Sequence, residues 1–179
     1  MYRKTYDIVY TGMFTVLLAI CSWISLPTMI PFTLQTFGIF LILFVLGGKR
    51  GTTVILIYLL LGCIGIPVFS NFGAGVGYLL GNTGGFALGF LWIGLSLWLS
   101  EKLCPANPYI QIFASLIGLA LCYLFGCFWF LQVSGSANTL PTFHSVLSIC
   151  VLPFIVPDLC KLGMAYLFSK RLKPLLNLK

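Results

Sequence analysis

Residues 145–170 read SVLSICVLPFIVPDLCKLGMAYLFSK, an apolar run that is interrupted by one acid and one later base. In a helix, at about 1.5 Å per residue, such a run is long enough to cross a hydrocarbon core of about 30 Å. Asp158 and Lys161 lie inside it, where a charged side chain costs at least a few kcal/mol. The run therefore predicts a membrane helix, and its two charges are a candidate functional site.

The composition of the whole chain agrees with a membrane protein. It is 60% hydrophobic and 7% charged, so a soluble domain of 179 residues would have too few charged residues on its surface to remain in solution. Ten basic residues against three acids give a net charge of +7. The bases flank apolar runs instead of clustering with polar and aromatic side chains, which indicates a lipid bilayer as partner and no nucleic acid.

Six apolar segments predict an all-α integral membrane protein, in which residues 1–179 form a single six-helix membrane domain. The first, fourth, fifth and sixth segments are long enough to span a bilayer. The second and third are short, so either the bilayer thins there or protein shields the backbone beside them. In order, the segments are Asp7–Ser25, Gln35–Gly47, Thr52–Ile66, Gly84–Leu103, Tyr109–Val133 and Ser145–Lys170.

The distribution of lysine and arginine predicts the orientation. Six crossings place both termini on one side, together with the connections after the second and fourth segments. Those regions hold nine cations, whereas the other three connections hold none. Because basic residues stay inside, we expect a multi-pass protein of the plasma membrane with cytoplasmic N- and C-termini. The nine cations are Arg3, Lys4, Lys49, Arg50, Lys102, Lys170, Arg171, Lys173 and Lys179.

The uncharged connections are expected to be ordered loops that cap an outward-facing pocket. Residues 26–38 combine prolines and hydroxyls with one amide, Gln35, and residues 62–85 contain eight glycines. Each glycine costs about 1 kcal/mol against alanine in a helix, so this density needs another reason. Close packing is favoured for Gly62, Gly65 and Gly89. A ligand-binding loop is favoured for residues 73–85, which also carry Tyr78, Asn82 and Thr83.

Two interpretations of the charged pair stay open. Asp158 and Lys161 are three residues apart, so on a helix they share one face. They either pin the last helix inside the bundle or contact a ligand, since a carboxylate accepts from N–H groups and an ammonium holds a carbonyl or carboxylate. Pro157 suits a first helical turn, so a helix or half-helix is expected to begin there. Trp92 likewise either packs or faces the pocket.

The sequence offers no catalytic set and no metal or cofactor site. It lacks a Ser-His-Asp set, paired carboxylates and the Cys/His spacing of metal ligands, so we expect no enzyme. Gly73–Gly77 has the wrong spacing for a nucleotide fingerprint, so ATP hydrolysis is not expected. The seven cysteines are interpreted as free packing residues.

Four blocks together resemble the signature of the BioY family, the biotin-specific substrate-binding (S) component of energy-coupling factor (ECF) transporters. They are PFTLQTFG (31–38), GIPVF (65–69), GYLLGNTGG (77–85) and PDLCK (157–161). The chain length, the six segments and the block order are also similar. Asn82 departs from the family pattern, which usually has proline there, and Val156 stands where glycine is often found. The family's alanine-rich stripe on the first helix is here Thr11, Thr15 and Ala19.

The resemblance implies capture of biotin from outside the cell, followed by release driven by partner subunits. Those partners would be a membrane coupling subunit of the EcfT type and two cytoplasmic ATPases, with Thr11, Thr15 and Ala19 at the interface. Alternatives are an S component for another vitamin, a stand-alone facilitator or channel for a small solute, and a small intramembrane enzyme or assembly factor. The expected ligand contacts are Gln35, Tyr78, Asn82, Gly85, Trp92, Asp158 and Lys161.

Overall fold

The computed structural model describes residues 2–26, 32–104, 107–134 and 143–176, and these are folded almost entirely as helices. A short antiparallel hairpin pairs Ser25 with Thr33 and Leu26 with Phe32. The elements in order are α1 (Tyr2–Trp23), β1 (Ser25–Leu26), β2 (Phe32–Thr33), α2 (Gln35–Leu46), α3 (Gly48–Cys63), the 3₁₀ turn η1 (Ser70–Phe72), α4 (Val76–Leu80), α5 (Gly84–Leu103), α6 (Pro108–Ser134), α7 (Phe143–Cys150) and α8 (Leu152–Leu175).

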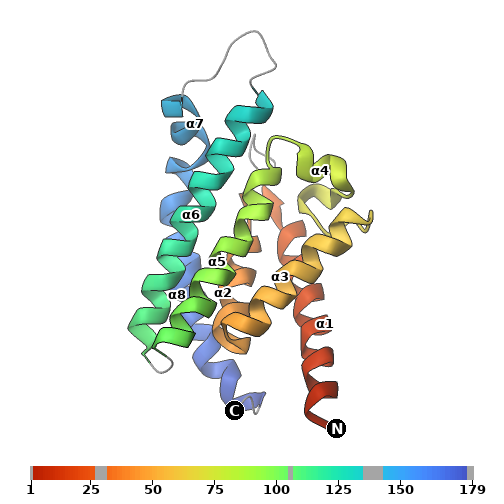
Figure 1. Ribbon diagram of the computed structural model, residues 1–179, viewed down its shortest axis with the longest axis vertical. Coiled ribbons are helices and arrows are strands. Elements are labelled where there is room, and N and C mark those ends of the chain that lie inside the picture. Colours follow the sequence, from red (N-terminus) through yellow and green to blue (C-terminus); the bar gives the residue numbers. More distant parts are fainter. Residues whose placement is uncertain (1, 27–31, 105–106, 135–142, 177–179) are drawn as a thin grey trace.

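The helices run between two ends of an elongated bundle (Figure 1). The beginning of α1 and the end of α8 lie at one end, together with the α2–α3 corner. The end of α5 and the beginning of α6 lie there too. The short helices α4 and α7 lie at the opposite end. The termini and connections that carry the basic residues, which the sequence analysis placed on one side of the membrane, therefore lie at the same end of the bundle.

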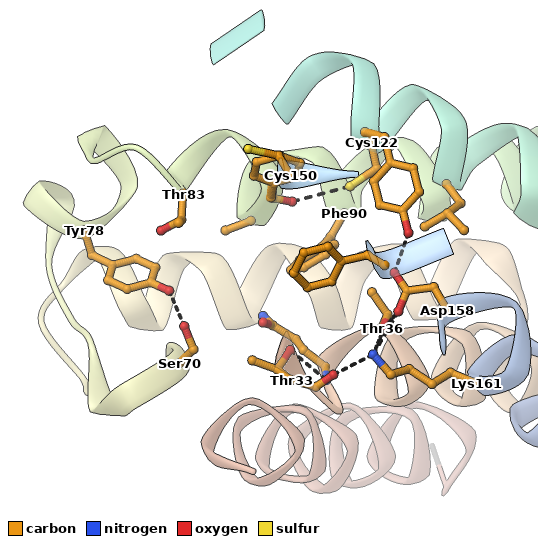
Figure 2. Close-up of a pocket in the computed structure, with 16 residues that line it drawn as sticks. Thr33, Thr36, Ser70, Tyr78, Thr83, Phe90, Cys122, Cys150, Asp158 and Lys161 are labelled. Carbon is orange, nitrogen blue, oxygen red and sulfur yellow. Dashed lines mark hydrogen bonds and ion pairs between the residues drawn. The ribbon is translucent and has the colours of Figure 1, made fainter. Parts of the chain in front are cut away.

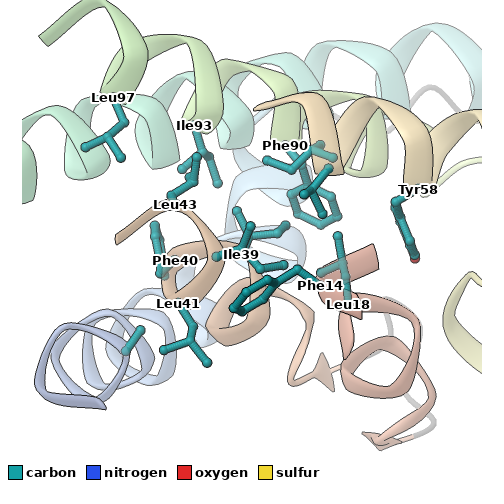
Figure 3. Close-up of a cluster of buried hydrophobic side chains, with 14 of the residues drawn as sticks. Phe14, Leu18, Ile39, Phe40, Leu41, Leu43, Tyr58, Phe90, Ile93 and Leu97 are labelled. Atoms are coloured by element: carbon teal, nitrogen blue, oxygen red, sulfur yellow. The ribbon is translucent and has the colours of Figure 1, made fainter. Parts of the chain in front are cut away.

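Helix α2 forms the centre of the bundle, which explains its short length and uniform hydrophobicity. Every residue from Gly38 to Leu46 is buried, because α2 packs against α8, α3 and α1 at once. Figure 3 shows its side chains between Phe14 and Leu18 of α1 and Phe90 and Ile93 of α5. A helix that is apolar all round needs such enclosure by neighbouring helices.

Four stretches among the described residues are long and apolar enough to cross a membrane: Thr5–Trp23, Gly84–Leu103, Pro108–Ser134 and Phe143–Leu175. They correspond to the four long segments expected from the sequence. Helix α2 is apolar but shorter. The α5 bounds agree with the prediction, and the bounds of α1, α2, α3 and α6 lie within five residues of the predicted segments. Helix α4 forms inside residues 73–85, which were expected to be a ligand-binding loop.

The last predicted segment differs from the structure. It consists of two helices, α7 and α8, that meet at Val151, whose φ of −124° and ψ of −53° interrupt the helix. Helix α8 begins at Leu152 with Pro153 in its first turn, where the missing N–H costs nothing. The prediction of a helix start at Pro157 is therefore wrong, because Pro157 lies inside α8.

Glycines allow α5 and α6 to pack closely, as expected for Gly89. A Cβ atom at Gly89 would lie 2.8 Å from Cys122 Sγ, and one at Gly118 would lie 2.6 Å from Ile93 Cα. Gly62 is also a packing position, since a Cβ there would overlap the Phe69 ring. The packing interpretation of Gly65 is wrong: its φ is +100° with open space around it, so it serves a turn.

Candidate ligand-binding cavity

A cavity lies between the hairpin, α4, α5, α6 and α8, toward the end of the bundle that carries α4 and α7. Including its open mouth, the space measures about 630 Å³. Polar side chains stand at its ends and aromatic and aliphatic ones form its walls. The lining residues are Thr33, Gln35, Thr36, Ser70, Tyr78, Thr83, Phe86, Ala87, Phe90, Leu119, Cys122, Tyr123, Cys150, Phe154, Asp158 and Lys161.

Asp158 and Lys161 form an ion pair at one end of the cavity (Figure 2), with 2.8 Å between Lys161 Nζ and Asp158 Oδ1. Both residues are buried, with 2% and 4% of their surfaces exposed. They lie three residues apart on α8, so its helical geometry places them on one face, as predicted. A pair this deeply buried needs further hydrogen bonds to offset its desolvation.

The protein itself supplies those bonds. The ammonium also donates to Thr33 O at 2.7 Å and to Thr36 Oγ1 at 3.1 Å, and lies 4.2 Å from the centre of the Phe32 ring. The carboxylate accepts from Thr36 Oγ1 at 2.8 Å and from the Tyr123 hydroxyl at 2.6 Å. All three ammonium protons are engaged. The Asp158 carboxylate retains about one lone-pair site, on the oxygen that contacts Tyr123.

Gln35, at the first turn of α2, is the second buried polar group of the cavity, with 6% of its surface exposed. Its Nε2 donates to the Tyr58 hydroxyl at 2.8 Å, and that hydroxyl donates to Val68 O at 2.9 Å. Tyr58 itself is fully buried on α3. The amide of Gln35 is thereby fixed by a chain of hydrogen bonds that leads away from the cavity.

Ser70 and Tyr78 occupy the other end of the cavity, as Figure 2 shows. Their hydroxyls are hydrogen bonded to each other, and the Tyr78 ring stacks on Phe69 at 4.7 Å between centroids. Their shared hydrogen bond uses one of the two hydroxyl protons, so the other is available to a ligand acceptor. A ligand with two polar ends and an apolar body suits this arrangement.

Four of the seven predicted ligand contacts line the cavity: Gln35, Tyr78, Asp158 and Lys161. The structure brings them together from α2, α4 and α8. The alternative, that Asp158 and Lys161 fix α8 within the bundle, is also consistent with their hydrogen bonds to other residues of this chain. Their contact with a ligand stays a prediction.

The other three predicted contacts lie elsewhere. Asn82 is exposed. Gly85 is buried against α6, where a Cβ atom would lie 2.2 Å from Trp129 Cβ. Trp92 is 43% exposed and its ring lies 6.4 Å from that of Phe125. None of these three residues is among those that line the cavity, so the cavity does not support them as ligand contacts. For Trp92 the packing interpretation is favoured.

Sequence reasoning missed several polar residues of the cavity, namely Thr33, Thr36, Ser70 and Tyr123. Thr33 and Thr36 lie inside the block around Gln35, so their hydroxyls were a usable signal. Tyr123 was a weaker one, because a tyrosine in an apolar run is usually interpreted as packing. Cys122 and Cys150, which were interpreted as packing residues, are buried and also border the cavity.

The predicted partner stripe is mostly internal. Thr15 and Ala19 are only 4% and 5% exposed, and the hydroxyls of Thr11 and Thr15 donate to backbone carbonyls one turn earlier in α1. Thr11 and Thr15 border a groove between α1 and α3. The exposed ridge of α1 is formed instead by Ile8, Gly12, Val16 and Ile20. Contact of Thr11, Thr15 and Ala19 with a partner stays a prediction.

Comparisons with known proteins point to one family. A family model described as the BioY family matches residues 1–178. The chain is 38% identical to the biotin transporter BioY of Thermotoga maritima over 94% of this chain and 96% of that protein. It is 34% identical to a probable biotin transporter BioY of Pyrococcus horikoshii over 95% and 98%. A crystal structure of the S-component for biotin from an ECF-type ABC transporter superposes with a TM-score of 0.83, at 25% identity, over 97% of this chain and 93% of that one.

Proposed function

The chain belongs to the BioY family, and from this premise we propose that it is the substrate-binding membrane subunit of an ECF-type transporter and captures biotin from outside the cell. The observation that carries the proposal is the cavity. It joins a buried acid, a buried amide and a hydroxyl pair from distant parts of the chain around apolar walls. The relatives named as biotin transporters span nearly the same length.

The chemistry of biotin matches this lining. Its ureido group carries two N–H donors and a carbonyl, its thioether ring is apolar, and its tail ends in a carboxylate. Asp158 keeps about one free acceptor position for an N–H group. The apolar ring is matched by the aromatic side chains of Phe86, Phe90 and Phe154. The hydroxyl pair of Ser70 and Tyr78 supplies a donor at the other end.

The proposed orientation places both termini in the cytoplasm and the cavity toward the outside. Six crossings are made by α1, α2, α3, α5, α6 and the α7–α8 pair. The arrangement is supported by the cations, since Lys49, Arg50 and Lys102 lie at the end of the bundle that carries the beginning of α1 and the end of α8. The uncharged strand β2 and helix α4 contribute Thr33 and Tyr78 to the lining of the cavity.

The proposed partners are a membrane coupling subunit and two cytoplasmic ATPases. Support comes from the solved S-component, which is described as part of an ECF-type ABC transporter. In this scheme the chain binds the vitamin and its partners drive release.

Binding by the purified protein tests the proposal. We expect 1:1 biotin binding without nucleotide, measured by calorimetry in detergent against thiamine and riboflavin as controls. A response to thiamine or riboflavin with none to biotin would assign the cavity to another vitamin. Biotin flux into proteoliposomes that contain this chain alone, without saturable binding, would favour a stand-alone facilitator.

A further inference from the structure

A chain of hydrogen bonds connects the amide of Gln35 to the buried hydroxyl of Tyr58 and from there to Val68 O. Tyr58 does not line the cavity, yet its hydroxyl lies 2.8 Å from the Gln35 amide and 2.9 Å from Val68 O. Both side chains are almost fully enclosed, with 6% of Gln35 and 0% of Tyr58 exposed. Figure 3 shows Tyr58 beside the central cluster of the bundle.

Proton counting fixes the direction of both hydrogen bonds. A backbone carbonyl has no proton to give, so the Tyr58 hydroxyl supplies the proton in its contact with Val68 O. That hydroxyl has only one proton, so toward Gln35 it can only accept. The group of Gln35 that faces Tyr58 is therefore the NH₂ group. A flipped amide would place two oxygens 2.8 Å apart with no proton between them.

Neighbouring residues hold the chain of bonds in place. The Ser22 hydroxyl of α1 also contacts Val68 O, and a carbonyl oxygen can accept two bonds. The Trp23 indole donates to the adjacent Pro67 O at 2.9 Å. The Tyr58 ring meets Phe69 edge to face, at 5.5 Å and 79°. The Pro67–Val68 backbone, whose Val68 carbonyl orders Tyr58, is thus tied to α1 by the side chains of Ser22 and Trp23.

We propose that Tyr58 is a positioning residue that holds Gln35 with Oε1 toward the cavity, where this oxygen accepts one N–H of the ligand. The inference rests on the proposed function, in which the ligand is a cyclic urea with two N–H groups. Among the described residues, Gln35 Oε1 accepts no hydrogen bond. The one fully buried side-chain oxygen or nitrogen there without a hydrogen-bond partner is Ser134 Oγ, so Gln35 Oε1 is not fully enclosed by protein. Asp158 offers the second acceptor. Two acceptors select a ligand with two N–H donors.

A double-mutant cycle tests whether Tyr58 affects ligand binding through Gln35. Tyr58→Phe removes the hydroxyl but keeps the ring, and Gln35→Met removes the amide at similar length. We expect each single variant to bind biotin more weakly by about 3- to 15-fold. The double variant binds no more weakly than Gln35→Met, because Tyr58 acts only through Gln35. Losses that add, or a Tyr58→Phe variant that binds like the parent, overturn the inference.

Ligand analogues give a readout that a packing role would not change. Biotin methylated on one or the other ureido nitrogen lacks one N–H group. For the analogue that lacks the N–H facing Gln35, we expect both single variants to bind as the parent does. If methylation of either ureido nitrogen weakens binding in every variant as much as in the parent, the inference that Tyr58 acts on the ligand through Gln35 is refuted. Either single variant suffices for this comparison if the other folds poorly.

Tyr166→Phe is the matched control. It removes the same atom from a partly buried tyrosine of α8 that does not line the cavity, so biotin affinity should be unchanged. A parent chain that does not bind biotin would overturn the proposed function and this inference together. A parent that binds, with unaffected variants, would overturn this inference alone.

Discussion

At the scale of single residues, the Asp158–Lys161 pair has two proposed roles, in stability and in ligand binding, that mutation can separate. The surrounding threonines and Tyr123 satisfy most of its hydrogen-bonding capacity without a ligand. Removing one partner leaves the other charge buried alone, which costs about 3–5 kcal/mol of stability. A single substitution therefore lowers binding for either reason and does not discriminate between them.

Replacing both charges does discriminate. We expect the double variant Asp158→Asn with Lys161→Met to melt close to the parent in detergent, because no lone charge remains buried. It should lose at least tenfold in biotin affinity, since a charge-assisted contact is worth roughly 1.5–3 kcal/mol, or about 10- to 150-fold. Thermal unfolding and calorimetry on the same preparation measure both quantities. A stable double variant with parental affinity would leave the pair structural.

At the scale of elements, the close approach of α5 and α6 depends on glycine. A Cβ atom at Gly118 would lie 2.6 Å from Ile93 Cα, which is backbone and cannot move aside cheaply. We expect Gly118→Ala to destabilise the protein by about 1–3 kcal/mol through overpacking, measured as a lower unfolding temperature.

Gly163 of α8 is the control for that substitution, because no atom of the described residues lies within 4 Å of its added Cβ. There, alanine should leave the unfolding temperature unchanged or raise it, by about 0.5–1 kcal/mol in stability, as helix propensity dictates. Equal effects at the two glycines would mean that α5 and α6 separate easily.

The helices were predictable from sequence because long apolar runs in a membrane protein leave little other choice for the backbone. The break at Val151 was not. Apolar residues continue on both sides of it, and Pro153 and Pro157 each suit a first helical turn. In the structure Pro153 lies in the first turn of α8 and Pro157 inside the helix, a choice that the two proline positions alone do not determine.

The cavity was predictable where polar residues stood in short blocks, and not where single side chains arrive from distant helices. Gln35 and the charged pair were expected. Tyr123 and Tyr58 lie in apolar runs and gain their roles only through contacts with Asp158 and Gln35, across 35 and 23 positions of the chain. The positions of Asn82 and Trp92 depend on how the loop and α5 turn, which the motif did not specify.

At the scale of the whole molecule, we propose that the coupling subunit docks on α1. Thr15 is 4% exposed, so tryptophan at Thr15 would disturb the packing of α1 before it reached a partner. Ile8, Gly12 and Val16 are exposed at a spacing of four residues, and Gly12 has open space around it. Small residues let another helix approach closely in a membrane, so the proposed docking contact is better probed at Gly12.

We expect Gly12→Trp to reduce co-purification of the coupling subunit with this chain by severalfold, because a large side chain at Gly12 keeps another helix at a distance. Biotin affinity should stay parental, since α1 does not contribute to the cavity lining. Gly163→Trp on α8 is the matched control, for it places the same bulk at another exposed glycine with open space around it. If Gly163→Trp weakens assembly and Gly12→Trp does not, the coupling subunit docks on α8, and the proposed face on α1 is exposed to lipid alone.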